Sequence, residues 1–272
     1  MKLYLKCVVS MAMLALAGTA SAQEEPAASP LYGGAWFTGP ANAYLRLGIG
    51  ADKLDTSNGK WAPPGAAPKG DDPVIFYDLS DPDGVAGTIA FGRQLRIGWR
   101  GEISLTGFDS KDVSGPWSYT RPATPGPHAD MSTSVRSNAL MANVLYDLPS
   151  VGTGRFSAQP FLLAGVGVAW NKMDNWTRTR ASNIARPTRT FEGDTNSEFA
   201  WTLGAGISWD IGKIKSGPIK LDLMYQYFDL GNAQGDSKPL SGNGSSIPVN
   251  PLEFDLTSQV ISVGVRIPLN LR

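Results

Sequence analysis

The side chains that most often carry catalysis are scarce in this chain of 272 residues. It holds one histidine, His128, between Pro127 and Ala129, and one cysteine, Cys7. A serine or cysteine nucleophile needs a base placed to take its proton, and no serine or acidic residue is recognisably paired with His128. We therefore expect His128 to be a solvated loop residue and the chain to have no catalytic residue.

The sequence also lacks the patterns of metal and nucleotide sites. No G-x-x-x-x-G-K-[ST] or G-x-G-x-x-G pattern stands between a strand and a helix, where a phosphate would be bound. No group of histidine, cysteine or acidic residues has the spacing of metal ligands. We expect neither a cofactor nor a metal, and we expect that the protein is not an enzyme.

The first 22 residues have the form of a secretory signal peptide. Lys2 and Lys6 precede an apolar run over 7–17, and a small-residue ending follows. Such a segment is removed after export, and the ending predicts cleavage between Ala22 and Gln23. The mature chain would then contain no thiol, because Cys7 lies inside the removed segment.

The mature chain, 23–272, is expected to begin with a flexible segment over 23–41 that is rich in Ala, Pro, Glu and Gly. It would carry 22 basic and 24 acidic residues, a balance that gives no electrostatic reason to expect nucleic acid binding. No later stretch has 18 consecutive apolar residues, so a spanning helix is not expected. If the chain crosses a membrane, it must do so as a closed barrel.

One stretch, 198–210, has the alternation of a membrane strand. Phe199, Trp201, Leu203, Ile207 and Trp209 share one parity, and small or polar residues occupy the other. Successive side chains of a strand point to opposite faces. Eleven residues at about 3.3 Å each, tilted by roughly 40°, span on the order of 28 Å, close to the apolar band of a membrane barrel. A strand of a soluble sandwich would show the same parity, so this stretch alone leaves both open.

The whole chain predicts an all-β fold, an eight-stranded antiparallel up-and-down transmembrane β-barrel over 42–272. The expected connections alternate between long loops, at 54–84, 109–132, 171–197 and 231–253, and short turns. Outer-membrane barrels have this asymmetry, with short periplasmic turns and long external loops. The predicted strands cover 43–52, 85–92, 95–108, 133–148, 156–170, 198–210, 219–230 and 255–267. The turn between the second and third is expected at 93–94, a hairpin-length connection. Pro160 cannot donate to a ladder, so regular pairing in the fifth strand is expected to start after it.

The polar parity of these strands carries the charges, and the other carries large apolar residues. An eight-stranded barrel has an interior just wide enough for side chains, so charges inside it must pair with one another. The alternative is a soluble, lipocalin-like barrel in which the charged face meets water. We expect a lumen charge network of Arg46, Asp52, Arg96, Arg100, Glu102, Lys220, Asp222 and Arg266.

Aromatic residues near the strand ends share the apolar parity. Tryptophan and tyrosine concentrate at membrane interfaces, where an amphipathic ring is favoured. We therefore expect an aromatic girdle formed by Trp99, Tyr146, Trp170, Trp201, Trp209, Tyr225 and Tyr227.

Three stretches resemble the small outer-membrane β-barrel family, which includes the transmembrane domain of outer-membrane protein A and the opacity-type surface proteins. They are P-F-L-L-A-G-V-G-V-A at 160–169, W-T-L-G-A-G-I at 201–207 and L-D-L-M-Y-Q-Y-F-D-L-G at 221–231. The last looks like the Tyr-x-Tyr-x-Asp strand of that family. The resemblance implies the bacterial outer membrane, with lipids and lipopolysaccharide as surroundings.

The last predicted strand resembles the signal read by the barrel-assembly machinery, which would then be a partner. The matching positions are Ser262, Gly264, Ile267 and Leu269, although the chain ends in Asn270-Leu271-Arg272 and not on an aromatic residue.

Three functions remain open, in order of preference. The first is a structural or surface-interaction role through the four long loops. Its third loop, 171–197, carries Arg178, Arg180, Arg186 and Arg189 and could bind an anionic ligand. The second is a narrow channel for ions or small solutes with a charged lumen. A lipid-modifying enzyme comes third, for want of a histidine-based site.

Overall fold

The computed structural model describes residues 42–62, 74–76, 79–96, 98–118, 129–152, 157–179, 188–241 and 250–270. The predicted signal peptide with Ala22 and Gln23, the segment 23–41 and His128 lie outside these ranges. Within them, no helix is both long and apolar enough to cross a membrane.

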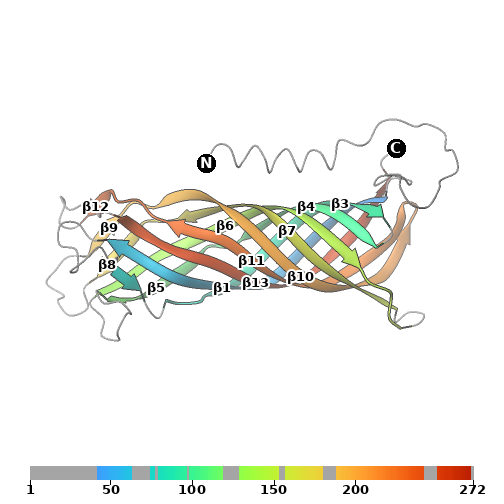
Figure 1. The fold of residues 1–272 in the computed structure, drawn as a ribbon, viewed down its shortest axis with the longest axis horizontal. Helices are drawn as coiled ribbons and strands as arrows, with labels where there is room; N and C mark the ends of the chain where they lie inside the picture. The colour runs from blue at the N-terminus through green and yellow to red at the C-terminus, as the bar shows by residue number, and fades with distance from the viewer. Residues whose placement is uncertain are drawn as a thin grey trace, which may run out of the picture.

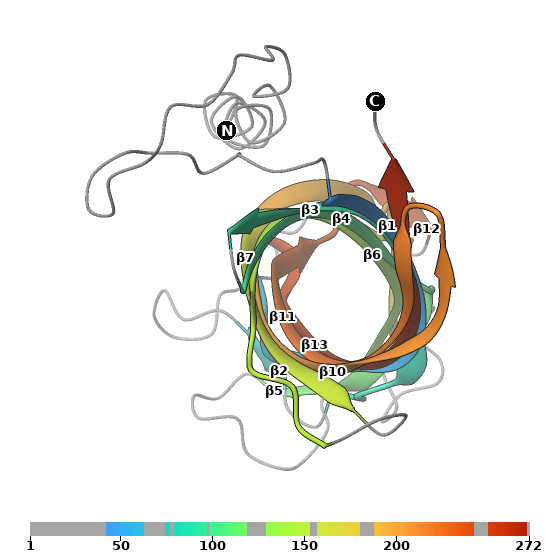
Figure 2. The ribbon, with the colours of Figure 1, turned by 90° about the vertical axis from the view of Figure 1, so that its right-hand side faces the viewer.

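Eight long strands form a closed, antiparallel, hydrogen-bonded ring (Figures 1 and 2). Each strand pairs with the next ring strand along the chain, and the last pairs with the first, so the topology is up-and-down. Closure leaves the ring no unpaired edge, which a single sheet would have. The ring strands are β1 (Asn42–Ala62), β3 (Asp83–Arg96), β4 (Trp99–Phe108), β6 (Ala129–Asp147), β7 (Ala158–Met173), β10 (Asp194–Ile214), β11 (Gly217–Gln234) and β13 (Asn250–Asn270).

Five shorter strands gather at one end of the ring, in stretches that are predicted from the sequence to be long loops. They extend the wall there through pairs such as β5 with β6 and β8 with β6. We call this end the loop end, and the opposite end, where β3–β4, β6–β7 and β10–β11 connect, the turn end (Figure 1). The short strands are β2 (Val74–Phe76), β5 (Lys111–Ser118), β8 (Trp176–Thr179), β9 (Arg189–Phe191) and β12 (Pro239–Ser241).

Two local predictions are wrong. The turn expected at 93–94 lies instead between β3 and β4, where Arg96 pairs with Trp99 and Gly98 has φ +80°. A two-residue hairpin needs positive φ, which glycine adopts without steric cost. Regular pairing was also expected to begin after Pro160, but Pro160 pairs with Ile207 inside β7. Its carbonyl accepts a hydrogen bond from the Leu148 amide at 2.9 Å, so the proline still takes part in the structure through its acceptor.

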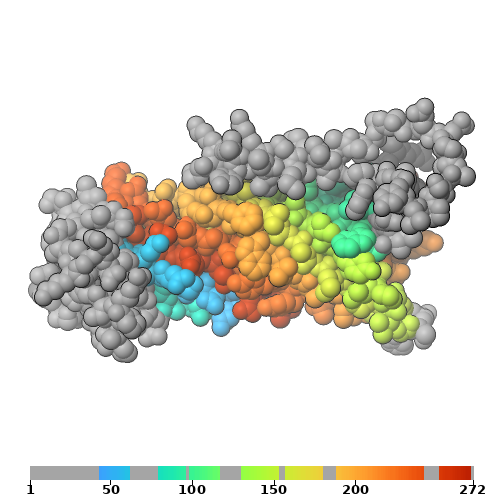
Figure 3. Space-filling model, in the orientation of Figure 1, coloured from blue at the N-terminus to red at the C-terminus, as the bar shows by residue number. Residues whose placement is uncertain are grey.

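The outer face of the ring is a belt of exposed apolar side chains, with members on all eight ring strands. Figure 3 shows one face of this wall, on which side chains of β10 and β7 lie next to each other. Soluble proteins rarely expose apolar patches beyond a few hundred Å², whereas outer-membrane barrels carry such a belt in lipid. The arrangement is that of an outer-membrane barrel, and a soluble barrel would need the reverse. The belt contains Leu47, Ile49, Val85, Ile89, Leu105, Val144, Leu162, Val166, Leu203, Ile207, Leu223, Ile261 and Val263.

Candidate functional site

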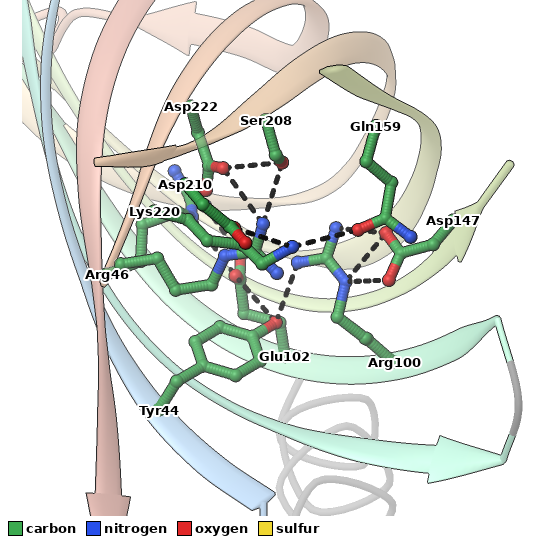
Figure 4. A network of polar contacts seen from close by, with 11 residues as sticks. Tyr44, Arg46, Arg100, Glu102, Asp147, Gln159, Ser208, Asp210, Lys220 and Asp222 are labelled. Carbon is green, nitrogen blue, oxygen red and sulfur yellow. Dashed lines mark hydrogen bonds and ion pairs between the residues drawn. The ribbon is translucent and has the colours of Figure 1, made fainter. Parts of the chain in front are cut away.

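The inside of the ring near the turn end holds a network of buried charges (Figure 4). Arg46 binds Glu102 through both its Nε, at 3.0 Å, and a terminal nitrogen. Arg100 donates from Nε and a terminal nitrogen to Asp147, the shorter contact being 2.7 Å. Fork-shaped guanidinium–carboxylate pairs of this kind are the strong class of charged hydrogen bond.

A third arginine closes the network on its other side. Arg266 donates to Asp222 Oδ1 at 2.9 Å and to Ser208 Oγ at 2.7 Å, and the serine hydroxyl donates to the same carboxylate. Three guanidinium groups therefore meet three carboxylates, so the network is balanced in charge. We call Arg46, Arg100, Glu102, Asp147, Asp222 and Arg266, together with Tyr44, the charge plug.

Tyr44 joins the parts of the charge plug. Its hydroxyl donates to Glu102 at 3.3 Å and accepts from Arg100 at 3.2 Å. The guanidinium carbons of Arg100 and Arg266 lie 5.7 and 5.3 Å from the centre of its ring, within the range of cation–π attraction. Gly92 faces Tyr44 across the β1–β3 ladder, and the absence of a side chain there makes room for the ring.

The strand register explains how residues far apart in sequence reach one place. Arg46 pairs with Arg266, and Arg266 pairs in turn with Lys220, at the turn ends of β1, β13 and β11. Side chains of one parity all point inward, so five of the predicted lumen residues lie in the charge plug: Arg46, Arg100, Glu102, Asp222 and Arg266.

The other three predicted members are placed differently. Asp52 is buried, but it lies farther along β1 and pairs with Lys111 of β5 at 2.6 Å. Lys220 lies at the rim of the turn end, where it contacts Gln159 at 3.0 Å and Asp210 at 3.3 Å. The Arg96 side chain lies outside the described part of the structure. Three residues outside the predicted lumen network also take part in its polar contacts. They are Tyr44 and Asp147 in the charge plug and Lys111, which pairs with Asp52.

The loop half of the lumen differs from the expected charged and small-residue lining. A continuous apolar cluster fills it, with Trp61 and Trp176 in edge contact and Phe191 stacked on Trp176 at 4.1 Å. We call this cluster of buried side chains the apolar cap. Its larger members are Leu54, Trp61, Phe108, Val113, Met131, Val135, Met173, Trp176, Phe191, Phe228, Leu230, Leu252, Phe254 and Leu256.

The rim above the apolar cap is held by polar contacts. Lys238 forms an ion pair with Glu192 at 2.8 Å, next to the pairing of β9 with β12. The hydrogen bond to Glu192, together with the negative charge of that carboxylate, raises the pKa of Lys238.

The predicted girdle residues face outward in two groups. Trp99 and Tyr146 pack together beside the β3–β4 turn, with ring centres 4.8 Å apart. Trp201 and Tyr227 pack together toward the loop end, at 5.4 Å, and the Trp201 indole donates to Asp229. The remaining members, Trp170, Trp209 and Tyr225, are half-buried or exposed. Their role at the membrane interface stays a prediction.

The predicted assembly signal lies within the turn-end half of β13. Ser262 and Gly264 are buried in the lumen, whereas Ile267 and Leu269 are half-exposed on the opposite parity. Recognition by the assembly machinery stays a prediction.

The described ranges contain no group of three or more histidine, cysteine or acidic side chains arranged to hold a metal. Near the turn end the lumen presents paired charges.

Comparison with known proteins gives relatives in three Brucella species. No protein-family model matches this chain. Uncharacterized proteins of Brucella abortus, Brucella suis and Brucella melitensis are each 30% identical to it, over 72% of this chain and 71% of theirs.

Solved structures with some likeness include Neisserial surface protein A, at 14% identity, with 84% of this chain and 97% of that chain covered and a TM-score of 0.45. The outer membrane protein OprG of Pseudomonas aeruginosa has 14% identity, the same coverage and a TM-score of 0.43. The assignment to the outer membrane rests on the closed ring and the apolar belt. This chain, a small outer-membrane β-barrel, belongs to the same family as the Brucella proteins.

Proposed function

We propose that this outer-membrane barrel is a surface-interaction protein, whose closed barrel holds the loop end as a rigid platform outside the cell. The observation that carries the proposal is the apolar cap. Trp176 of β8 and Phe191 of β9 belong to the third external loop, and both are completely buried in that cap. Packing of this density fixes the loop bases, so the exposed parts of the loop start from a defined surface.

The alternative function, a narrow channel, is opposed by the same geometry. An ion crossing the lumen would have to pass both the charge plug and the apolar cap. Buried ion pairs of this geometry are costly to separate, because each partner left alone keeps an unpaired charge. Purified protein in planar lipid bilayers is expected to show no single-channel conductance. Reproducible conductance steps that disappear with Glu102→Gln would favour the channel instead.

The third loop supports an anionic partner for the platform. Arg178 and Arg189 are cross-strand neighbours on β8 and β9, and the Arg178 guanidinium lies 5.3 Å from the centre of the Trp61 ring. Arg180 and Arg186 belong to the same loop, outside the described residues. Arginine binds phosphate and sulfate through paired hydrogen bonds, so a phosphorylated surface saccharide is the ligand class we propose.

The test compares two charge-removing variants for binding to immobilised lipopolysaccharide, with its phosphates intact or removed. Arg180→Gln/Arg186→Gln/Arg189→Gln takes three charges from the loop, each worth about 1 kcal/mol near an anionic surface, so a loss of at least about tenfold is expected. Lys213→Gln/Lys215→Gln removes two exposed charges at the turn end and serves as the control. Equal binding by both variants, or equal binding after phosphate removal, would reject the anionic partner.

A further inference from the structure

The ladder between β10 and β11 does not extend to their loop ends. Their ladder stops at the pair Trp201–Asp229. Beyond this point β10 continues only on β7, up to Asp194, and β11 continues only on β13, up to Gln234. Over 194–200 and 230–234 the two strands therefore stay in contact without a backbone ladder between them, and we call this stretch the seam.

The end of the β10–β11 ladder lies next to a glycine. Gly231 has φ +74°, and the register of β11 against β13 shifts between Asp229 and Asn232. A Cβ on Gly231 would lie 2.5 Å from Cβ of Glu198, so a side chain cannot be placed there without moving β10. The left-handed conformation lets β11 leave the ladder with β10 at this residue, and the missing side chain lets the two strands stay in close contact there.

Three asparagines bridge the seam in place of the ladder. The Asn171 amide, completely buried, donates to the carbonyls of Leu230 and Asn232, both at 2.8 Å. The Asn196 amide donates to the same Asn232 carbonyl at 2.8 Å and to the Asn232 side chain at 3.0 Å. Ser137 fixes Asn171 from behind by donating to its Oδ1 at 2.8 Å. We call Asn171, Asn196 and Asn232 the asparagine latch.

The seam lies between a surface pocket and the interior. Outside, a pocket of about 310 Å³ is lined in part by Glu198, Gly231 and Asn232. Inside, Leu230 and Ala233 of the apolar cap are completely buried.

We propose that the seam is a conformational gate, which opens when the asparagine latch releases and joins the outer pocket to the apolar cap. Along the rest of their length β10 and β11 are held together by a backbone ladder, which must unpair over many residues to open. At the seam the bonds that must break are the side-chain hydrogen bonds of the asparagine latch, which run to the carbonyls of Leu230 and Asn232 and between Asn196 and Asn232. Local opening proceeds where few interactions oppose it, so this point opens first while the rest of the ring stays closed.

Hydrogen exchange of the folded protein in lipid nanodiscs tests the proposal. Amides over 229–234 are expected to exchange faster than those over 222–228, which lie on the same strand within intact ladders. Asn171→Ala removes hydrogen bonds to two carbonyls and is expected to speed seam exchange by on the order of tenfold. The control is Asn143→Ala, which removes another buried lumen asparagine, one that donates to Ser104 at 2.9 Å. It should leave seam exchange unchanged. Equal exchange of the two segments, or equal effects of the two variants, would overturn the gate.

A second variant keeps the test independent of folding defects. Asn196→Cys/Asn232→Cys places two thiols where the native side chains already touch, and the only native cysteine lies in the predicted signal peptide. Oxidation should slow seam exchange to the rate of 222–228, and reduction should restore it. Exchange that is indifferent to the disulfide would reject the opening.

Discussion

Arg46 and Glu102 meet inside the barrel from strands that are not neighbours, because β3 lies between β1 and β4 in the ring. The Arg46 Nε donates to Glu102 Oε2 at 3.0 Å, and both residues are less than 5% exposed. The pair thus spans the inside of the wall instead of following a ladder. One ion pair therefore links β1 to β4 across the inner face of β3.

Removing the carboxylate of this pair is expected to destabilise the barrel strongly. Glu102→Gln leaves the Arg46 guanidinium buried without its counter-charge, and breaking a buried pair in this way costs about 3–5 kcal/mol. Urea unfolding in lipid vesicles, followed by tryptophan fluorescence, measures the loss.

Two further variants sharpen that measurement. Arg46→Met/Glu102→Met removes both charges and should recover much of the stability, because no unpaired charge remains. Lys60→Gln breaks the exposed pair with Glu253, and should cost less than about 1 kcal/mol. If Glu102→Gln behaves like Lys60→Gln, the charge plug does not stabilise the barrel.

The sequence predicts the ring and the charged inner parity, because strand alternation is a local property that a barrel repeats. Arg46, Arg100 and Glu102 share that parity and therefore reach the same lumen. Asp147 lies on the inward parity of β6 and could have been found by extending the same rule to the strand end. Tyr44 could not have been found by this rule, because its place in the charge plug depends on the room that Gly92 leaves on another strand.

The apolar cap was beyond prediction for a different reason. Strands β8, β9 and β12 have three or four residues, too few to show a period of two. Trp176 of β8 and Phe191 of β9 are buried in the apolar cap at the loop end. The other side chains of that cap come from strands far apart in sequence, so a local pattern does not reveal it. The ion pair of Lys111 with Asp52 escapes prediction for a related reason, because β5 lies in a stretch that is predicted to be a loop.

Truncation of the apolar cap is expected to loosen the loop end. Trp176→Ala removes a completely buried ring that stacks on Phe191 and donates to the Asp236 carbonyl at 2.9 Å. Such truncations cost about 3–5 kcal/mol. Limited proteolysis should cut the third loop faster, while the gel mobility of the unboiled barrel stays that of the folded form.

The matched control for this variant is Trp201→Ala, which removes a half-buried, outward-facing indole. It should leave loop proteolysis unchanged. Faster cleavage in both variants would mean that protection of the third loop also depends on the outward-facing aromatic residues and does not come from the apolar cap alone.

Two glycines of β3 test the close packing around Tyr44. A Cβ on Gly92 would lie 2.2 Å from Cζ of Tyr44, whereas a Cβ on Gly87 meets nothing within 4 Å. Overpacking costs about 1–3 kcal/mol, so Gly92→Ala should lower stability by that amount. Gly87→Ala should stay within about 0.5 kcal/mol of the parent. Equal urea midpoints for the two variants would show that Tyr44 is free to move away.

The position of the membrane around the ring is tested by placing a charge on two exposed apolar residues. Ile49 lies in the belt and is 65% exposed, whereas Leu240 lies on β12 at the loop end and is 46% exposed. If the belt meets lipid, Ile49→Arg must bring a guanidinium into hydrocarbon, at a cost of about 2–4 kcal/mol near the midplane. Leu240→Arg places the same charge in water and should be neutral. Folding into vesicles, followed by the gel shift between unboiled and boiled samples, measures both variants. A water-soluble barrel would accept the two substitutions alike, so equal folded fractions would contradict the assignment, and a selective loss for Ile49→Arg would support it.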